Sequence, residues 1–195
     1  MFSPETAAQV ETVVKLGGAV LDHVETFDAV LAALGAAAQS RRLLIVPGGG
    51  AFADAVRDVD RRFRLSDTAA HWMAVLAMDQ HAHLIAARLA GAALVAEPRE
   101  IAAALDARDI PVLAPSRWLR TADPLPHSWD VTSDSIAAWV AGRVGAGRLV
   151  LVKPAGARPS DTIVDPYFTR ALPPGVSSLM VAADQIDRLR TALSA

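Results

Sequence analysis

Val13-Val14-Lys15-Leu16-Gly17-Gly18, a buried-type strand that ends in a lysine and a glycine pair, decides how this chain is read. A second segment, Leu151-Val152-Lys153-Pro154-Ala155-Gly156, repeats the pattern near the other end of the chain. These two lysines are the only ones among 19 basic Lys and Arg residues. A lysine kept against an arginine background favours a compact ammonium, as at a transferring phosphoryl group, over a planar guanidinium. Biased composition is the alternative reading, and the strand-end positions favour function.

The order of strands and helices indicates the fold class. Apolar runs predict strands at 12–16, 42–47, 92–96, 110–114, 148–153 and 177–182. Helical periodicity predicts helices at 25–38, 50–60, 67–90, 98–107, 133–144 and 183–193, with Ser66 or Asp67 as a cap of the third. Residues 61–64, 115–130 and 154–171 are predicted to be irregular. This alternation predicts an α/β fold, a single three-layer αβα domain over residues 1–195 with a mainly parallel sheet.

Composition restricts the partners and the chemistry. A net charge of −2 and a pI near 6.2 disfavour nucleic acid as a partner. The first residues lack a signal-peptide pattern and every apolar stretch is interrupted by charge, so we expect no membrane association and a cytoplasmic location. The absence of cysteine excludes disulfides, thiolate metal sites and cysteine nucleophiles. A mean hydropathy of +0.29 favours buried strands and an oligomeric interface.

Two glycine turns follow predicted strands, Gly17-Gly18 after the first and Gly48-Gly49-Gly50 after the second. Such turns let backbone N–H groups approach an anion, and a following helix N-terminus adds partial positive charge. They therefore favour phosphate or carboxylate, although a tight strand-to-helix turn needs the same glycines. No P-loop sequence is present. Gly48, Gly50 and Ala53 fit the dinucleotide fingerprint, but no acidic strand end follows at the required distance, which disfavours NAD.

The helix predicted from residue 133 starts with Thr132-Ser133-Asp134. Thr132 or Ser133 is a natural cap. Asp134 either serves the helix dipole or lies between the two lysines and holds both ammonium groups toward a phosphoryl group. His71, His81 and His83 share the long helix without the spacing of a metal site, so no metal site is predicted.

Four motifs in order resemble the amino acid kinase superfamily: Lys-x-Gly-Gly, a strand ending in Gly-Gly-Gly, Thr-Ser-Asp-Ser at a helix start, and a late strand closing on lysine. The resemblance implies an acceptor-side half at about 1–125, a nucleotide-side half at about 126–195, and transfer of the γ-phosphoryl group of ATP without a covalent intermediate. Mg²⁺ would come with ATP. Lys15 would stabilise the transferring group, Lys153 would meet the ATP phosphates and Asp134 would organise both. Other implied ligands of the nucleotide are Gly17, Gly18, Thr132, Gly156, Asp161, Asp165 and Tyr167; those of the acceptor are Gly48, Gly49 and Gly50.

Residues 65–74 and 77–79 look most like the small branch that phosphorylates an aminomethylfuran methyl phosphate in methanofuran synthesis. The acceptor would then be a phosphate monoester, with Arg57 and Arg64 as candidate ligands, unless these arginines form a solvated basic turn. Trp118, Trp129 and Trp139 either line the acceptor pocket or cover the sheet. The resemblance also implies a homodimer through the helix at 67–90 and a trimmed nucleotide lobe at 154–176. Kinases of acetylglutamate, uridylate or isopentenyl phosphate, or a non-catalytic nucleotide- or anion-binding protein, are the alternatives.

Overall fold

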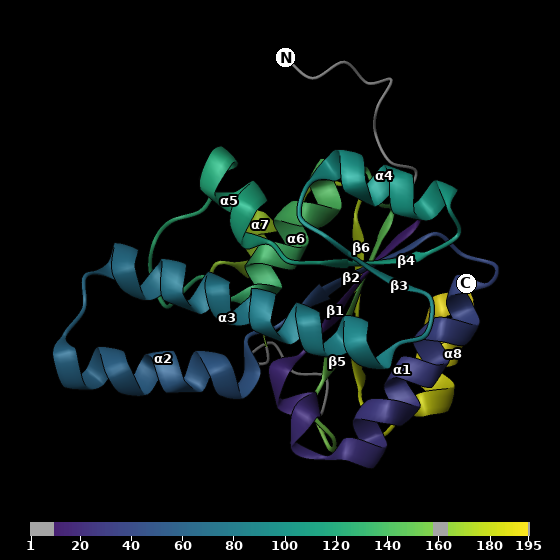
Figure 1. The fold of residues 1–195 in the computed structure, drawn as a ribbon, viewed down its shortest axis with the longest axis horizontal. Helices are drawn as coiled ribbons and strands as arrows, with labels where there is room; N and C mark the ends of the chain where they lie inside the picture. Colours follow the sequence, from purple (N-terminus) through teal and green to yellow (C-terminus); the bar gives the residue numbers. More distant parts are fainter. Residues whose placement is uncertain (1–9, 158–163, 195) are drawn as a thin grey trace.

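A six-stranded sheet forms the centre of the computed structural model, which describes residues 10–157 and 164–194 (Figure 1). The strand order is β3-β4-β2-β1-β5-β6, and every pair is parallel. Helices lie on both faces of this sheet, so the predicted α/β fold with a mainly parallel sheet is confirmed. The strands are β1 (Thr12–Leu16), β2 (Leu43–Pro47), β3 (Ala92–Val95), β4 (Ile110–Leu113), β5 (Arg148–Lys153) and β6 (Ser177–Ala182).

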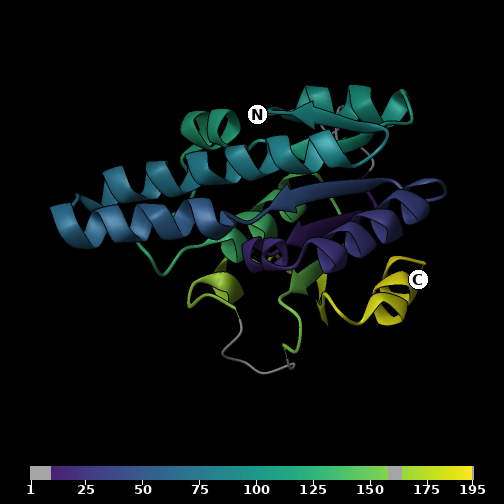
Figure 2. The ribbon, with the colours of Figure 1, turned by 60° about the horizontal axis from the view of Figure 1, so that its bottom comes forward.

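In residues 10–157 and 164–194, eight α-helices and one short 3₁₀ helix surround the sheet. Helices α2 and α3 pack against each other and extend past the sheet as a pair (Figure 1, Figure 2). In the described part of the chain, no helix has both the length and the apolar character needed to cross a bilayer. The helices are η2 (Gly18–Asp22), α1 (Val24–Ala38), α2 (Gly50–Phe63), α3 (Asp67–Arg88), α4 (Pro98–Asp106), α5 (Ser116–Ala122), α6 (Ser133–Arg143), α7 (Phe168–Ala171) and α8 (Ile186–Ser194).

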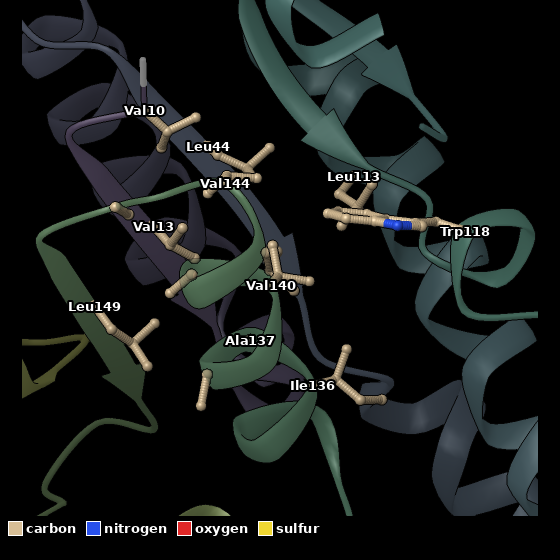
Figure 3. Close-up of a cluster of buried hydrophobic side chains, with 14 of the residues drawn as sticks. Val10, Val13, Leu44, Leu113, Trp118, Ile136, Ala137, Val140, Val144 and Leu149 are labelled. Carbon is tan, nitrogen blue, oxygen red and sulfur yellow. The ribbon is translucent and has the colours of Figure 1, made fainter. Parts of the chain in front are cut away.

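The two faces of the sheet bury alternate side chains of the central strands. Val13 and Leu149 pack with α4, α5 and α6, and Figure 3 shows them beside Ala137 and Val140 of α6. The neighbouring residues of the same strands pack on the other face with α1, α8 and the end of α3. Because side chains alternate along a strand, Lys15, two residues after Val13, points to the face that α6 covers.

The register of β1 and β5 places the second lysine on the same face. Lys15 is paired with Leu151, so Lys153 lies two residues further along β5 and points the same way. The two lysines therefore lie on adjacent strands at the carboxyl edge of the sheet, beneath the start of α6. Adjacent parallel strands thus bring together two side chains that are 138 positions apart in the sequence.

The following four segments differ from the sequence prediction. Residues 61–63 are helical and belong to α2, because Arg57 and Arg61 pair with Asp54 and Asp58 along its exposed side. Residues 115–130 contain α5, and the irregular stretch up to 171 contains the single turn α7. The last helix begins at Ile186 rather than 183. These differences are all at helix ends or in helices of seven residues or fewer, where periodicity is weakest.

Candidate active site

Lys15, Asp134 and Lys153 meet in one buried cluster between β1, β5 and the first turn of α6. The Nζ of Lys15 lies 2.9 Å from Oδ1 of Asp134, and the Nζ of Lys153 lies 2.5 Å from Oδ2 of the same carboxylate. Each of the three residues is 5% exposed or less. The carboxylate therefore holds one ammonium on each oxygen. This is the contact predicted from the sequence, and the catalytic roles of the three residues stay predictions.

The charges of the cluster affect one another strongly. Burial alone would raise the pKa of Asp134, but the nearby ammonium groups of Lys15 and Lys153 and their hydrogen bonds bring that pKa below its ordinary value. The pKa of Lys153 is lowered by burial and then by repulsion from Lys15, against the attraction of Asp134. The two ammonium groups share the Asp134 carboxylate, and the negative charge of Asp165 also acts on Lys153. Two lysine ammonium groups side by side at the strand ends are placed to contact an anion that binds there.

Asp165 fixes the start of α6 and with it the position of Asp134. Its Oδ2 accepts hydrogen bonds from the backbone N–H of Thr132 at 2.9 Å, the Thr132 hydroxyl at 2.7 Å and the N–H of Ser135 at 3.0 Å. The Ser135 hydroxyl also donates to this carboxylate. Thr132 is the N-cap residue but makes no capping bond of its own. A carboxylate at a helix N-terminus satisfies free N–H groups and complements the dipole.

This arrangement bears on two predicted nucleotide ligands, whose roles stay predictions. Thr132 and Asp165 were expected to bind the nucleotide, but their side chains bind each other and the first turn of α6. Thr132 also lines the cavity next to Ser133, so it remains a candidate ligand, and Asp165 supports the turn that carries Asp134. Tyr167 is the N-cap residue of α7 and is half-buried against the core. The backbone N–H of Gly156 donates to Asp184 at 3.1 Å. Asp161 lies outside the described residues.

The two glycine turns are pressed together at the carboxyl ends of β1 and β2. The N–H of Gly48 donates to the Leu16 carbonyl at 2.7 Å, which ties the second turn to the first. A Cβ on Gly18 would lie 2.0 Å from the backbone nitrogen of Gly50, and Gly50 itself has a φ of +55°. Side chains at these positions would force the turns apart. Backbone therefore forms the floor of the site next to the cluster.

A cavity of about 220 Å³ opens from these turns and runs between α2 and α3. Gly18, Gly49 and Gly50 line its inner end, together with Ser133, the residue before Asp134. The N-terminus of α2 contributes further partial positive charge at that end. Apolar side chains of α3 and α6 form much of the wall. The cavity thus joins a floor of backbone glycines to a small chamber with both apolar and polar walls.

Trp129 and Arg57 form part of the cavity wall. The indole Nε1 of Trp129 donates to Asp60 at 2.8 Å, and the Arg57 guanidinium lies 4.8 Å from the centre of the indole ring. Trp118 and Trp139 pack against each other elsewhere, with ring centroids 4.9 Å apart. Of the three tryptophans left open by the sequence, only Trp129 is among the residues that line this cavity.

Arg64 is not among the residues that line the cavity, and its contact with the acceptor stays a prediction. It caps the far end of α2 in the left-handed region, with a φ of +50°, and its N–H donates to the Asp60 carbonyl. At about 1.5 Å per residue, it lies about 20 Å along the helix from Gly50. The sequence predicted residues 61–64 to be irregular and near the acceptor. In the structure residues 61–63 are the last turn of α2, which lies away from the sheet.

His71 faces the cavity as a neutral ring at neutral pH. Burial, together with the stacked His127 ring 4.3 Å away, lowers its pKa to about 4. The sequence placed His71 on the long helix but gave no sign of its partner, which comes from the loop before α6. An uncharged aromatic ring at this position extends the apolar wall of the cavity.

Comparison of the sequence with known proteins points to one family. The profile of the amino acid kinase family matches residues 11–154. The (5-(aminomethyl)furan-3-yl)methyl phosphate kinase of Methanocaldococcus jannaschii is 33% identical over 135 residues, which are 66% of this chain. The matched part spans 58% of the length of that relative. The predicted resemblance to this branch is confirmed.

Solved structures agree on the fold. The uridylate kinase of Archaeoglobus fulgidus superposes with a TM-score of 0.72 at 16% identity, covering 95% of this chain and 96% of that one. The UMP kinase of Ureaplasma parvum gives 0.67 at 14% identity, covering 94% and 96%. With the profile match across both lysine motifs and both glycine turns, this chain belongs to the amino acid kinase family.

Proposed function

We propose that this protein transfers the γ-phosphoryl group of ATP to a small acceptor that is itself a phosphate monoester. The buried Lys15–Asp134–Lys153 cluster beside two glycine turns carries the proposal. Phosphoryl transfer needs positioning and charge stabilisation more than covalent chemistry, and this cluster offers both. The family to which the chain belongs supports the same reaction class.

In the proposed reaction an oxygen of the acceptor phosphate attacks the γ-phosphorus, the bond to the bridging oxygen breaks, and ADP leaves. Lys15 stabilises charge on the transferring group, and Lys153 stabilises the phosphates of the leaving ADP. Asp134 keeps both ammonium groups in place and accepts no proton, because its pKa is lowered. The N–H groups of the glycine turns hold phosphate oxygens.

We propose that Mg²⁺ enters the site with ATP. In residues 10–157 and 164–194, no three or more His, Asp or Glu side chains are grouped as a metal site. Phosphate oxygens are the hard ligands that Mg²⁺ prefers, and it keeps several waters when bound to nucleotides. The metal would neutralise part of the triphosphate charge, while Lys15 and Lys153 neutralise the rest.

The proposed acceptor is the phosphate monoester of an aminomethylfuran. The name of the 33% identical relative supports this choice, and so do the residues that line the cavity. Its volume of about 220 Å³ suits a single small ring, with Trp129 and His71 as flat walls. Asp54 and Asp67 also line it, and two carboxylates in an anion site favour an acceptor with a cationic amine at its other end. Acetylglutamate, uridylate and isopentenyl phosphate lack such a group.

We expect Asp67→Asn to weaken binding of the aminated acceptor. Asp54 is already paired with Arg57 at 2.7 Å, which makes Asp67 the better partner for an ammonium group. Loss of one exposed charge contact corresponds to about 1 kcal/mol, so KM for the acceptor rises about fivefold. Steady-state kinetics with the acceptor and with its des-amino analogue check this. An equal rise of KM for both would contradict the role assigned to Asp67.

The direct test is incubation with ATP, Mg²⁺ and the aminomethylfuran phosphate, followed by ³¹P NMR. The expected products are ADP and a new diphosphate ester. Acetylglutamate, uridylate and isopentenyl phosphate serve as competing acceptors in parallel reactions. Tight binding of ATP with no ADP from any acceptor would point instead to a non-catalytic nucleotide-binding protein.

Two further assignments are proposed with the function. Residues 1–195 form a single domain, and two copies pair through α3. Leu76 in the middle of α3 is 42% exposed, and Phe63 at the end of α2 that leads into α3 is 66% exposed, so each helix of the pair offers some apolar surface. Sedimentation equilibrium on the full chain would give the oligomeric state.

A further inference from the structure

His81 lies behind the acceptor's glycine turn, where it is completely buried. Its side chain is 0% exposed, and its Nδ1 lies 2.6 Å from the carbonyl oxygen of Gly48. Gly49 lines the cavity, whereas His81 does not. The ring therefore contacts the back of the turn whose front faces the acceptor.

The protonation state of His81 follows from this contact. A carbonyl oxygen can only accept, so Nδ1 carries the hydrogen. Burial lowers the pKa of His81, the hydrogen bond to Gly48 opposes this, and nearby Lys15 lowers it further. The ring is therefore neutral, and Nε2 has a bare lone pair. Within the described residues that buried Nε2 atom has no hydrogen-bond partner.

An unsatisfied buried nitrogen is a cost to stability that a leucine or phenylalanine at this position would not carry. Packing in the core therefore does not explain why a histidine is present at position 81. Among the described residues its polar contact is with the Gly48 carbonyl, and the N–H of Gly48 is in turn bound to the Leu16 carbonyl. The carbonyl contact with His81 orients the peptide between Gly48 and Gly49, and the N–H contact with Leu16 fixes the preceding peptide.

We propose that His81 is a positioning residue that presents the N–H of Gly49 to the anionic group of the acceptor. In a trans peptide the N–H points opposite to the carbonyl of the same plane. The Gly48 carbonyl is held toward His81 on α3, so the N–H of Gly49 points away from α3. It then adds to the N-terminal N–H groups of α2 as a phosphate donor. This inference rests on the proposed function for the identity of the acceptor.

Three variants at this position test the role. His81→Leu removes the donor, and it exchanges an unsatisfied Nε2 for an unsatisfied Gly48 carbonyl, so the unfolding midpoint should change little. KM for the phosphate acceptor should rise about tenfold, the effect of one lost hydrogen bond, with KM for ATP unchanged. His81→Asn keeps an N–H near the Nδ1 position and should restore the acceptor KM. His81→Gln places its amide further out and should not.

A second readout needs no turnover. The backbone amide resonance of Gly49 should shift on titration with inorganic phosphate in the wild type and in His81→Asn, and much less in His81→Leu. Absence of a shift in the wild type, or an equal shift in His81→Leu, overturns the role of His81 even if the enzyme turns over. Absence of turnover with a normal Gly49 shift overturns only the proposed reaction.

Discussion

Replacing Lys15 by arginine is expected to lower the turnover number by about 100-fold or more, although the charge is kept. The Lys15 ammonium sits 2.9 Å from Asp134 with 5% of the residue exposed, so there is no room for a planar guanidinium in the same place. The Gly17 turn lies next to this side chain, since a Cβ built on Gly17 would come into ordinary contact with the Lys15 Nζ at 3.5 Å. A displaced charge no longer faces the transferring phosphoryl group.

The measurement is ADP release under saturating ATP and acceptor, with the unfolding midpoint recorded for each variant. Arg190→Lys is a matched control, because Arg190 is on α8 with a side chain 62% exposed, and it should leave turnover unchanged. A Lys15→Arg variant that folds normally and keeps full activity would show that placement of this ammonium is unimportant and would remove the basis of the proposed mechanism.

The fold was largely predictable because buried parallel strands are unusually clear in a sequence. All six predicted strands are present within one residue of their bounds, since each is a nearly continuous apolar run. Ser66 caps α3 as expected, with its hydroxyl accepting from the N–H of Ala69. Helix α5 was missed because its support comes from outside the segment. The N–H of Ser116 donates to Asp79 on α3 at 3.0 Å, a contact that local periodicity cannot reveal.

The central cluster was predictable for a different reason. Lys15 and Lys153 stand out in an arginine-rich chain, and both come at the ends of strands whose carboxyl edges must meet. Asp134 stands at a helix start between the strands in sequence, and the structure brings it to both lysines. When a rare residue type stands at the carboxyl end of a parallel strand, the sequence alone predicts which side chains lie close together.

The supporting contacts were not predictable from the sequence. Asp165 and Thr132 both have side-chain oxygens that could bind a ligand. Only the contact between them shows that they stabilise the start of α6. His81 and Trp129 depend on partners 33 and 69 positions away, the Gly48 carbonyl and the Asp60 carboxylate. A sequence gives the chemical type of such side chains, whereas the packing of helices on the sheet decides which atoms they reach.

Asp134→Asn is expected to be the most destabilising single change in the site. It removes the carboxylate that both buried ammonium groups contact, and removing one partner of a buried ion pair costs about 3–5 kcal/mol of unfolding free energy. Turnover should also fall by about 100-fold or more, because the two ammonium groups repel and move apart. Chemical denaturation and ADP release measure the two effects. Asp187→Asn, whose side chain is 97% exposed, is the control and should change neither.

The loss of stability in Asp134→Asn should depend on pH in a definite direction. The pKa of Asp134 is lowered in the folded protein, so its contribution is fully present above the ordinary aspartate pKa of about 3.9 and is lost as the pH falls toward the folded value. The difference in unfolding free energy between wild type and variant should therefore be constant near pH 7 and shrink below about pH 4. A difference that grows on acidification would contradict the ion-pair explanation.

A second substitution separates stability from function. Adding Lys153→Met to Asp134→Asn removes one of the two ammonium groups that have lost their shared carboxylate, and a methionine fills most of the same volume. The double variant should regain much of the unfolding free energy lost by Asp134→Asn, yet remain without turnover. Recovery of both would mean that the cluster only holds β1 and β5 to α6. Recovery of stability alone is the result expected if the buried charges are kept for their action on a phosphoryl group.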